Sequence, residues 1–363
     1  MTYFVIITLS VYCLWLIVML ISWHQIKPVN PGNEAHLKLT VIVPFRNESQ
    51  NLPVLVNSFD NLNLEGLSVE FLFVNDHSSD DFEKVFESVH IDYKLLSLPD
   101  NMSGKKAAIT FGIERSSGDV IITTDADCEV QPNWLQVINQ YFQNNQANMA
   151  FGGVTFKPVS FFDKLQLVEF APLIGTGAAS LNIGQPFMCN GANLAFRKSA
   201  FERVGGYDGN EHIASGDDEF LLAKINNQLK GEIRYMKDSD AVVSTSGSND
   251  IKTFFNQRKR WSSKWNKNLS VYKIFLALMV LLTAVATFMG LVSLSINFNI
   301  PVLTILVAKI ILEGIFIGSI LHHLNSSFNI FYYLLVQLVY PFYVVIFGAV
   351  AHWGGYKWKD RAY

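Results

Sequence analysis

The sequence predicts an α/β domain with a mostly parallel sheet, preceded by one membrane helix and followed by about three. Three observations predict this class. Of the 363 residues, 50% are hydrophobic and only 16% are charged, whereas soluble domains carry roughly 25% charged residues. The apolar residues gather at the two ends of the chain. Between these ends, short β-branched runs alternate with amphipathic segments, so we exclude a wholly soluble protein, a disordered chain and a fibrous repeat.

Charge and cysteine content argue against two further classes. The formal net charge is −3 and the isoelectric point is about 6.2, whereas a nucleic-acid-binding domain is normally basic. The three cysteines are Cys13, Cys128 and Cys189. Their wide spacing matches neither a disulfide framework nor a zinc site, so we expect the soluble part to face a reducing compartment.

The first apolar run, residues 3–23, is long enough to cross a bilayer as a helix. A cleaved signal peptide normally has Lys or Arg before its apolar core and a small-x-small site after it. No basic residue precedes this run, and the sequence after it is a poor cleavage site. We therefore expect a retained signal anchor at residues 1–24.

The middle of the chain consists of repeated strand–helix units. Apolar runs that suit buried parallel strands occur at residues 39–44, 69–74 and 120–124, and helical segments at 81–89, 106–116 and 132–143. This alternation predicts a mostly parallel sheet with right-handed crossovers. Ligands of such sheets bind beyond the carboxyl ends of the strands, where this chain has polar clusters.

Acidic residues follow two of the predicted strands. Asp125 and Asp127 come directly after residues 120–124 and, two apart on an extended chain, point to the same face. With a substrate's phosphates they could hold a hard divalent cation; an ordinary polar turn is the alternative. Asp76 follows residues 69–74, and helix capping by the polar residues after it leaves Asp76 unexplained.

Two further clusters each admit two interpretations. Lys105 and Lys106, at the start of a predicted helix, could bring a cation and backbone N–H groups to a phosphate, or could form a solvated basic pair. The run Asp217-Asp218-Glu219 could be a helix start favoured by the helix dipole, or could supply a general base. The spacing alone leaves both choices open.

The segment after the sheet domain combines aromatic and basic residues. On a helix that begins at residue 251, the apolar side chains share one face, among them Phe254, Trp261 and Trp265. Such a helix typically lies in the membrane interface, and a basic surface helix would not explain the two tryptophans. We expect residues 251–270 to form an interfacial segment.

Three more apolar stretches follow, at residues 271–294, 300–321 and 328–351. The middle one holds Lys309 and Glu313, four apart on one helical face, which we expect to pair with each other. The last contains Pro341 and is expected to be kinked or re-entrant. Membrane helices are thus predicted within residues 271–352, followed by a tail at 353–363.

Basic residues near the spans predict the orientation. The N-terminal tip has none, whereas seven lie between residues 252 and 273. The positive-inside rule then places the middle domain in the cytoplasm, in a multi-pass protein of the plasma membrane or, in a bacterium, of the inner membrane. With three C-terminal spans, the tail with Lys357, Lys359 and Arg361 would lie outside, against the rule. Either the tail is an exception or one stretch does not cross fully.

Taken together, these motifs resemble the family-2 glycosyltransferases with a GT-A fold. The similar branch is membrane-integrated and includes ceramide glucosyltransferase-like enzymes and processive polysaccharide synthases. The resemblance covers residues 39–265 and the pattern of one span before and several after. Its motifs are the strand with Pro44, Asp76, Asp125-x-Asp127, an acidic pair and Gln257-x-x-Arg260-Trp261.

For the donor, the resemblance implies a GT-A nucleotide-sugar-binding domain at residues 25–250. The residues that would border the nucleotide base and ribose are Pro44, Arg46, Glu48 and Asp76. Lys105 or Lys106 would approach the donor. Asp125 and Asp127 would hold the uridine and an Mg²⁺ or Mn²⁺ ion that bridges the diphosphate.

For the acceptor, the resemblance implies Asp218 as the general base that deprotonates a hydroxyl. The family usually has Glu-Asp at this pair, whereas this chain has Asp217-Asp218-Glu219, so Asp217 stays a candidate as well. The residues that would close over the diphosphate and the acceptor are Gln257, Arg260 and Trp261.

The implied activity is inverting transfer of a sugar from a nucleotide sugar, with UDP as the expected nucleotide, to a lipid or glycan acceptor at the membrane. The apolar stretch at residues 161–181 could rest against the bilayer and admit a lipid. A processive polysaccharide synthase is the alternative, although it would usually need more spans for a channel. A catalytically dead receptor or scaffold is a second alternative, which the intact set of acids disfavours.

Overall fold

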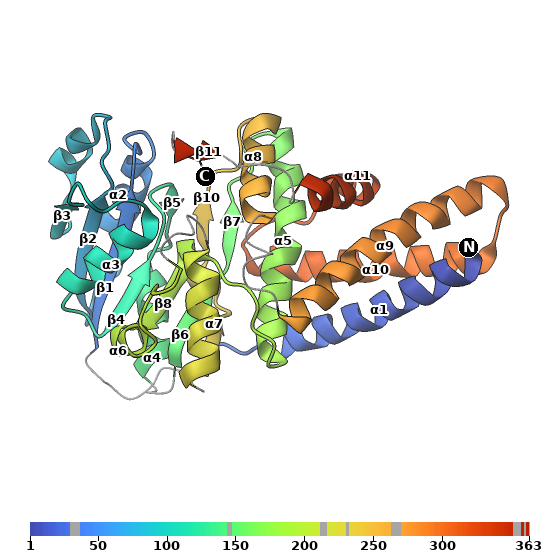
Figure 1. The fold of residues 1–363 in the computed structure, drawn as a ribbon, viewed down its shortest axis with the longest axis horizontal. Coiled ribbons are helices and arrows are strands. Elements are labelled where there is room, and N and C mark those ends of the chain that lie inside the picture. The colour runs from blue at the N-terminus through green and yellow to red at the C-terminus, as the bar shows by residue number, and fades with distance from the viewer. Residues whose placement is uncertain are drawn as a thin grey trace.

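The computed structural model of the chain describes residues 1–29, 37–143, 147–210, 216–229, 232–262 and 270–350, and the pairs 357–358 and 361–362. Along the long axis, a sheet domain occupies one end of the molecule and long apolar helices occupy the other (Figure 1). The N-terminus lies at the far end of these helices. The C-terminal end lies at the level of the sheet domain.

The sheet domain is built on seven strands in the order β3-β2-β1-β4-β8-β6-β9. β8 is antiparallel to both of its neighbours and every other pair is parallel, so the predicted mostly parallel sheet is confirmed. The strands are apolar because they are buried, and all four residues of β4 are inaccessible to solvent. Their bounds are β1 (Lys38–Phe45), β2 (Ser68–Asn75), β3 (Tyr93–Ser97), β4 (Val120–Thr123), β6 (Ala147–Gly152), β8 (Leu194–Arg197) and β9 (Glu232–Met236).

Helices connect these strands, and a small second sheet in the order β5-β10-β7 lies beside the first. The helices are α2 (Leu52–Asp60), α3 (Lys105–Arg115), α4 (Trp134–Gln143), α6 (Lys198–Arg203) and α7 (Asp217–Leu229). The small strands are β5 (Cys128–Glu129), β7 (Val154–Phe156) and β10 (Val243–Thr245), and short 3₁₀ turns occur at η2 (Gly191–Asn193) and η3 (Ser239–Ala241).

The helix expected at residues 81–89 is instead a 3₁₀ helix, η1 (Phe82–Ser88). Both ends of this segment are tied to the α2 region. Asp80 Oδ2 accepts the N–H of Ser49 at 2.7 Å, and Asp60 Oδ1 accepts the N–H of His90 at 3.1 Å. The residues between these ties adopt 3₁₀ geometry, which rises further per residue than an α-helix.

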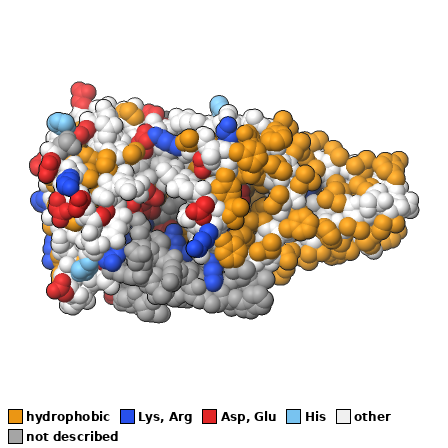
Figure 2. All heavy atoms as spheres, turned by 90° about the horizontal axis from the view of Figure 1, so that it is seen from above, with side chains coloured by type: hydrophobic (Ala, Val, Ile, Leu, Met, Phe, Trp, Pro, Cys, Tyr) orange, Lys and Arg blue, Asp and Glu red, His pale blue; other side chains and the backbone are white. Residues whose placement is uncertain are grey.

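Four helices are long and apolar enough to cross a membrane, among the residues that the structure describes. They are α1 (Thr2–Gln25), α9 (Val271–Ile296), α10 (Ile300–His323) and α11 (Ile330–Val350). α1, α9 and α10 run side by side away from the sheet domain, and α11 lies beside α5 and α8 (Figure 1). Figure 2 shows the apolar surface concentrated on this half of the molecule and charged side chains on the other.

The predicted pairing inside the membrane half is confirmed. Lys309 Nζ donates to Glu313 Oε2 at 2.9 Å and to Gln337 Oε1 of α11 at 2.8 Å. Tyr12 of α1 donates to Glu313 Oε1 at 2.6 Å. Because each charge has hydrogen-bonding partners, the pair is tolerated among apolar helices, and it links three of them.

Two helices lie between the halves. α5 (Phe161–Asn182) contacts α1, α10 and α11, and α8 (Ile251–Ser262) contacts α11. α5 begins at a capping box in which Ser160 and Asp163 satisfy each other's backbone N–H groups. Trp265 of the predicted interfacial face lies outside the described residues, as do residues 263–269 and most of the tail.

Candidate active site

Eight of the predicted site residues line one cavity between the sheet domain and helices α5 and α8. They are Lys105, Asp125, Asp127, Asp217, Asp218, Gln257, Arg260 and Trp261. The same cavity has apolar walls from α5, including Phe170, Leu173 and Ile174. One end is therefore strongly charged, and the other is apolar and adjoins helices that contact the membrane half.

The charged end is organised around Lys105, the first residue of α3. Its Nζ lies 2.6 Å from Asp125 Oδ1 and 3.6 Å from Asp217 Oδ2. Burial disfavours the charged ammonium, but Asp125, Asp217 and Asp218 outweigh this and raise the pKa of Lys105. Lys105 therefore remains a cation in the middle of the carboxylates throughout the neutral range.

Asp218 is held by backbone groups at the start of α7. Its Oδ2 accepts the N–H of Gly191 at 3.0 Å, and its Oδ1 accepts the N–H of Glu219 at 2.8 Å. A Cβ on Gly191 would lie 3.2 Å from Asp217 Oδ2 and 3.3 Å from Lys105 Nζ, so a side chain there would push both of these groups aside. The short turn η2 thus brings α7 close to α3.

Gly191, Lys273 and Glu169 were not among the predicted site residues. Lys273, the third residue of α9, lines the cavity and donates from Nζ to Glu219 Oε2 at 2.9 Å. A lone cation at the start of an apolar span was the available signal for Lys273. No local pattern identifies Gly191 or Glu169, because their partners are distant in the sequence.

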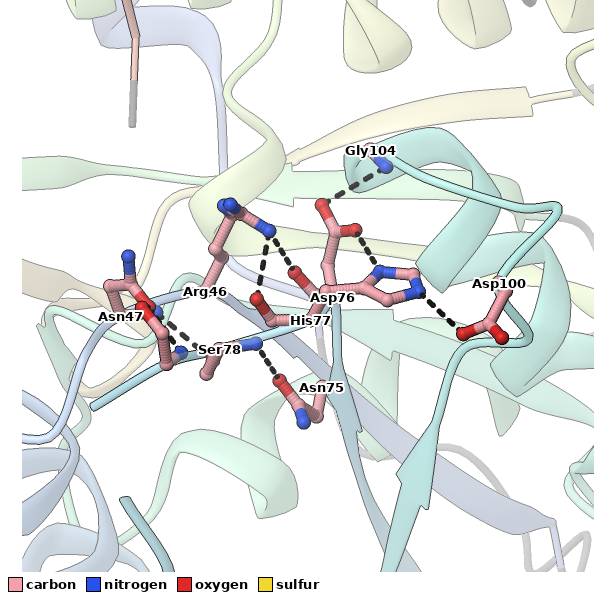
Figure 3. Close-up of polar contacts among 9 residues, drawn as sticks. Arg46, Asn47, Asn75, Asp76, His77, Ser78, Asp100 and Gly104 are labelled. Carbon is pink, nitrogen blue, oxygen red and sulfur yellow. Dashed lines mark hydrogen bonds and ion pairs between the residues drawn. The ribbon is translucent and has the colours of Figure 1, made fainter. Parts of the chain in front are cut away.

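Asp76 and Arg46 lie next to the cavity residues, at the carboxyl ends of β2 and β1 (Figure 3). Asp76 Oδ2 accepts the N–H of Gly104 at 3.0 Å, and its Oδ1 lies 3.2 Å from Nδ1 of His77. Arg46 donates to the backbone carbonyls of Asp76 and His77 at 2.8 and 2.9 Å. Since Gly104 immediately precedes Lys105, Asp76 fixes the start of α3.

Like Asp76 and Arg46, three further predicted residues are not among those that line the charged cavity. Lys106 is buried and turned away from it, with its Nζ donating to the carbonyl of Asn210 at 2.7 Å and lying over the ring of Phe220. Pro44 lies near the end of β1, and Glu48 accepts a hydrogen bond from Asn51. Of the two candidate lysines, only Lys105 reaches the acids.

The two strand-end carboxylates suit a divalent cation that arrives with a substrate. Asp125 and Asp127 both face the cavity, and within the described residues no three His, Cys, Asp or Glu side chains are grouped to hold an ion. Mg²⁺ commonly takes one or two protein carboxylates and completes its shell with phosphates and water. Burial, and then Asp127, raise the pKa of the neighbouring Cys128, so its thiol stays protonated.

Comparison with protein families gives a match over residues 40–205 to the sequence model of glycosyl transferase family 2. A glucosyl-dolichyl phosphate glucuronosyltransferase of Haloferax volcanii is 30% identical over 186 residues, which is 47% of this chain and 58% of the relative. A dolichol-phosphate mannosyltransferase of Pyrococcus furiosus is 29% identical over 32% of this chain and 33% of its own length. The chain thus spans little more than half of the first relative.

A solved structure resembles the chain over almost its whole length. This mannosyltransferase of Pyrobaculum calidifontis, in complex with GDP-Man and Mn²⁺, matches 96% of this chain and 98% of its own with a TM-score of 0.62. The sequence identity is 15%. The likeness therefore concerns the fold, including a GT-A domain and the apolar helices.

Proposed function

We propose that this protein transfers a sugar, with inversion, from a nucleotide sugar to a lipid-linked acceptor at the membrane surface. The match of residues 40–205 to the glycosyl transferase family 2 model supports the reaction class. UDP is the expected nucleotide. The observation that carries the proposal is one cavity that combines a cluster of charged side chains with an apolar wall from α5. A nucleotide diphosphate suits the charged end, and a lipid-borne acceptor suits the apolar one.

The charged residues of the cavity have separate roles toward the nucleotide diphosphate. Asp125 and Asp127 would hold Mg²⁺ or Mn²⁺, which, when bound, neutralises the diphosphate leaving group. Lys105 keeps a positive charge beside these carboxylates, and Arg260 brings a second cation from the opposite wall. Both cations oppose the negative charge that develops as the sugar–phosphate bond breaks.

The base acts on the other side of the sugar. Asp218 faces the cavity, and its two backbone N–H donors hold its carboxylate in place. We assign to Asp218 the role of general base, which accepts the proton of the acceptor hydroxyl. Asp217, which faces Lys105, is the neighbouring candidate. A phosphate acceptor is already ionised and needs no such base, so dependence on Asp218 distinguishes the two kinds of lipid-linked acceptor.

The relatives support a lipid-linked acceptor. The Haloferax relative is named for transfer to glucosyl-dolichyl phosphate, and the Pyrococcus relative for dolichol phosphate. In this chain the apolar wall formed by α5 lies against α1, α10 and α11. A polyisoprenyl chain in the bilayer could reach the cavity along these helices. We place the catalytic domain on the cytoplasmic side, as the basic residues around α8 indicate.

The test is transfer by the purified full chain in detergent or vesicles. A panel of UDP- and GDP-sugars is supplied with and without polyisoprenyl phosphate and a glycosylated polyisoprenyl phosphate, and nucleotide diphosphate release is measured. Release that depends on one lipid, with a product of one added sugar, supports the proposal. A long polymer indicates the processive alternative. A folded protein that binds a donor but releases no diphosphate with any acceptor overturns it.

A further inference from the structure

Helix α8 carries both residues that line the cavity and a buried arginine beside them. Gln257, Arg260 and Trp261 line the cavity, whereas Arg258 lies behind this lining and is 3% exposed. Its guanidinium forms a two-pronged ion pair with Glu169 of α5, in which Nε lies 3.2 Å from Oε1 and Nη2 lies 2.5 Å from Oε2. A buried pair of this kind costs desolvation, so its geometry must be well satisfied to persist.

Arg258 contacts two side chains that line the cavity, Trp261 and Gln257. Its guanidinium lies 4.2 Å from the ring centre of Trp261 and 4.4 Å from that of Phe254. Nη1 also donates to Oε1 of Gln257 at 2.5 Å. The Trp261 ring in turn packs on Phe170 of α5, with ring centres 5.6 Å apart.

The pair also connects to the membrane half. Tyr343 of α11 donates its hydroxyl to Glu169 Oε1 at 2.7 Å. Glu169 therefore holds residues of both α8 and α11 against α5. No charged residue of the Lys105 cluster takes part in these contacts, which all lie on the α5 and α8 side of the cavity.

We propose that Arg258 is a positioning residue for the acceptor, which rests on the transfer activity proposed above. Its pairing with Glu169 fixes the position of the guanidinium, whose flat face holds the Trp261 ring, and its hydrogen bond orients the Gln257 amide. These two side chains form the acceptor-side wall. Lysine cannot replace Arg258, because an ammonium supplies neither the two-pronged pair nor the planar stacking surface.

The test compares three variants: Arg258→Lys, Arg258→Gln, and a double variant that combines Glu169→Gln and Arg258→Gln. Lys252→Gln, which removes an exposed cation of α8, is the control. Arg258→Lys should raise the acceptor KM about tenfold and leave donor affinity within about threefold. Arg258→Gln alone leaves Glu169 charged and buried, and should also lower the thermal midpoint. The double variant removes both charges, so it should recover stability while its acceptor KM stays high.

Each outcome separates the positioning role from a merely structural one. If the double variant is as stable as the native protein and has the native acceptor KM, Arg258 serves the fold alone and the inference is wrong. If donor affinity falls by the same factor as the acceptor KM rises, Arg258 does not act specifically on the acceptor side and the inference is also wrong. Failure of the native protein to transfer any sugar would instead refute the proposed function.

A second inference concerns α11, whose two ends both contact the helices next to the sheet domain. Near its start, the Tyr332 ring lies 5.4 Å from that of Phe161 in α5. Near its end, the Phe347 ring lies 5.0 Å from that of Phe255 in α8. Between them, Tyr333 donates to the carbonyl of Ile310 in the middle of α10.

The other helices extend much further. Val5 of α1 packs with Val302 and Leu306 of α10, close to the turn between α9 and α10. α11 also packs against α9, where the Phe342 ring lies 5.9 Å from that of Phe288, and in Figure 1 it is foreshortened where α1, α9 and α10 are seen lengthwise. α11 therefore runs across these helices and does not run along them.

We infer that α11 lies in one leaflet and does not cross, so that the chain crosses the membrane three times. Its exposed apolar residues, such as Leu338, Val339 and Phe342, would then face acyl chains of the leaflet next to the catalytic domain. The tail would lie on the same side as that domain. This arrangement removes the conflict with the positive-inside rule that three C-terminal spans create.

Single added cysteines test this topology, since Cys13, Cys128 and Cys189 are all buried. Ala362→Cys reports the tail, Val54→Cys the catalytic domain, and Phe298→Cys the turn between α9 and α10. In sealed vesicles of one orientation, an impermeant maleimide should label both Ala362→Cys and Val54→Cys but not Phe298→Cys. In vesicles of the other orientation it should label Phe298→Cys alone. Labelling of Ala362→Cys together with Phe298→Cys would show that α11 crosses. This readout does not depend on transfer activity.

Discussion

The replacement Asp218→Asn tests the assignment of the base most directly. The amide keeps the shape of the carboxylate but cannot accept a proton from a hydroxyl. General base catalysis is worth about 10²–10⁴ in rate, which is about 3–5 kcal/mol of activation free energy. Turnover with a hydroxyl acceptor should fall by that factor.

The structure also predicts a cost in stability. Both carboxylate oxygens accept backbone N–H groups, from Gly191 and Glu219, so one of these groups would face the new NH₂ of asparagine. Losing a hydrogen bond to a charged acceptor costs about 1.5–3 kcal/mol. At roughly 2–4 °C per kcal/mol for a domain of this size, the thermal midpoint should fall by about 3–12 °C. A folded variant assayed well below that midpoint separates chemistry from stability.

The assay measures nucleotide diphosphate release at saturating donor and acceptor, with donor affinity measured separately. Asp218→Asn should bind the donor within about threefold of the native protein, whereas Asp127→Ala should weaken donor binding. Asp217→Asn and Glu219→Gln are the matched controls. If one of these is inactive while Asp218→Asn turns over normally, the assignment of the base is wrong.

Three further predictions concern the metal, the membrane pair and pH. EDTA should abolish transfer and added Mg²⁺ or Mn²⁺ should restore it, because Asp125 and Asp127 are anionic and would repel the diphosphate without a cation between them; full activity in chelator contradicts the metal role. Lys309→Leu should destabilise the protein by about 3–5 kcal/mol in a detergent melt, since it leaves Glu313 charged and buried, and adding Glu313→Leu should recover part of this. Lys94, Ser117 and Thr40 together outweigh burial and lower the pKa of Glu70 to about 2. The stability from Glu70 is therefore complete above its unfolded pKa near 4.3 and is lost as the pH falls through 2, so the difference in thermal midpoint between the native protein and Glu70→Gln should shrink over this range.

The periodic parts of the fold were predictable from the sequence. Buried parallel strands require continuous apolar runs, and residues 39–44, 69–74 and 120–124 form strands, the second and third of which are followed by acids. The pairing of Lys309 with Glu313 was predictable for a similar reason. On a helix, residues four apart are neighbours whatever surrounds the helix.

The choice between adjacent residues required the tertiary structure. Lys105 and Lys106 are equivalent in the sequence, but successive residues of a helix differ by about 100° in direction. The packing of α3, anchored through Gly104 by Asp76, turns Lys105 toward the acids and Lys106 toward Asn210. Spacing within a helix defines its faces but does not say which face meets which neighbour.

Contacts between distant segments could not be predicted from the sequence for the same reason. Glu169 and Arg258 are 89 residues apart, and no local sequence pattern around either residue identifies the other as its partner. Hydropathy gave α11 the length and composition of a membrane span. Its contacts with α5, α8, α9 and the middle of α10 are what the inferred direction of α11 rests on. Composition and period thus determined the elements and their chemistry, and packing decided which side chains meet, because a helix is positioned by the surfaces of its neighbours.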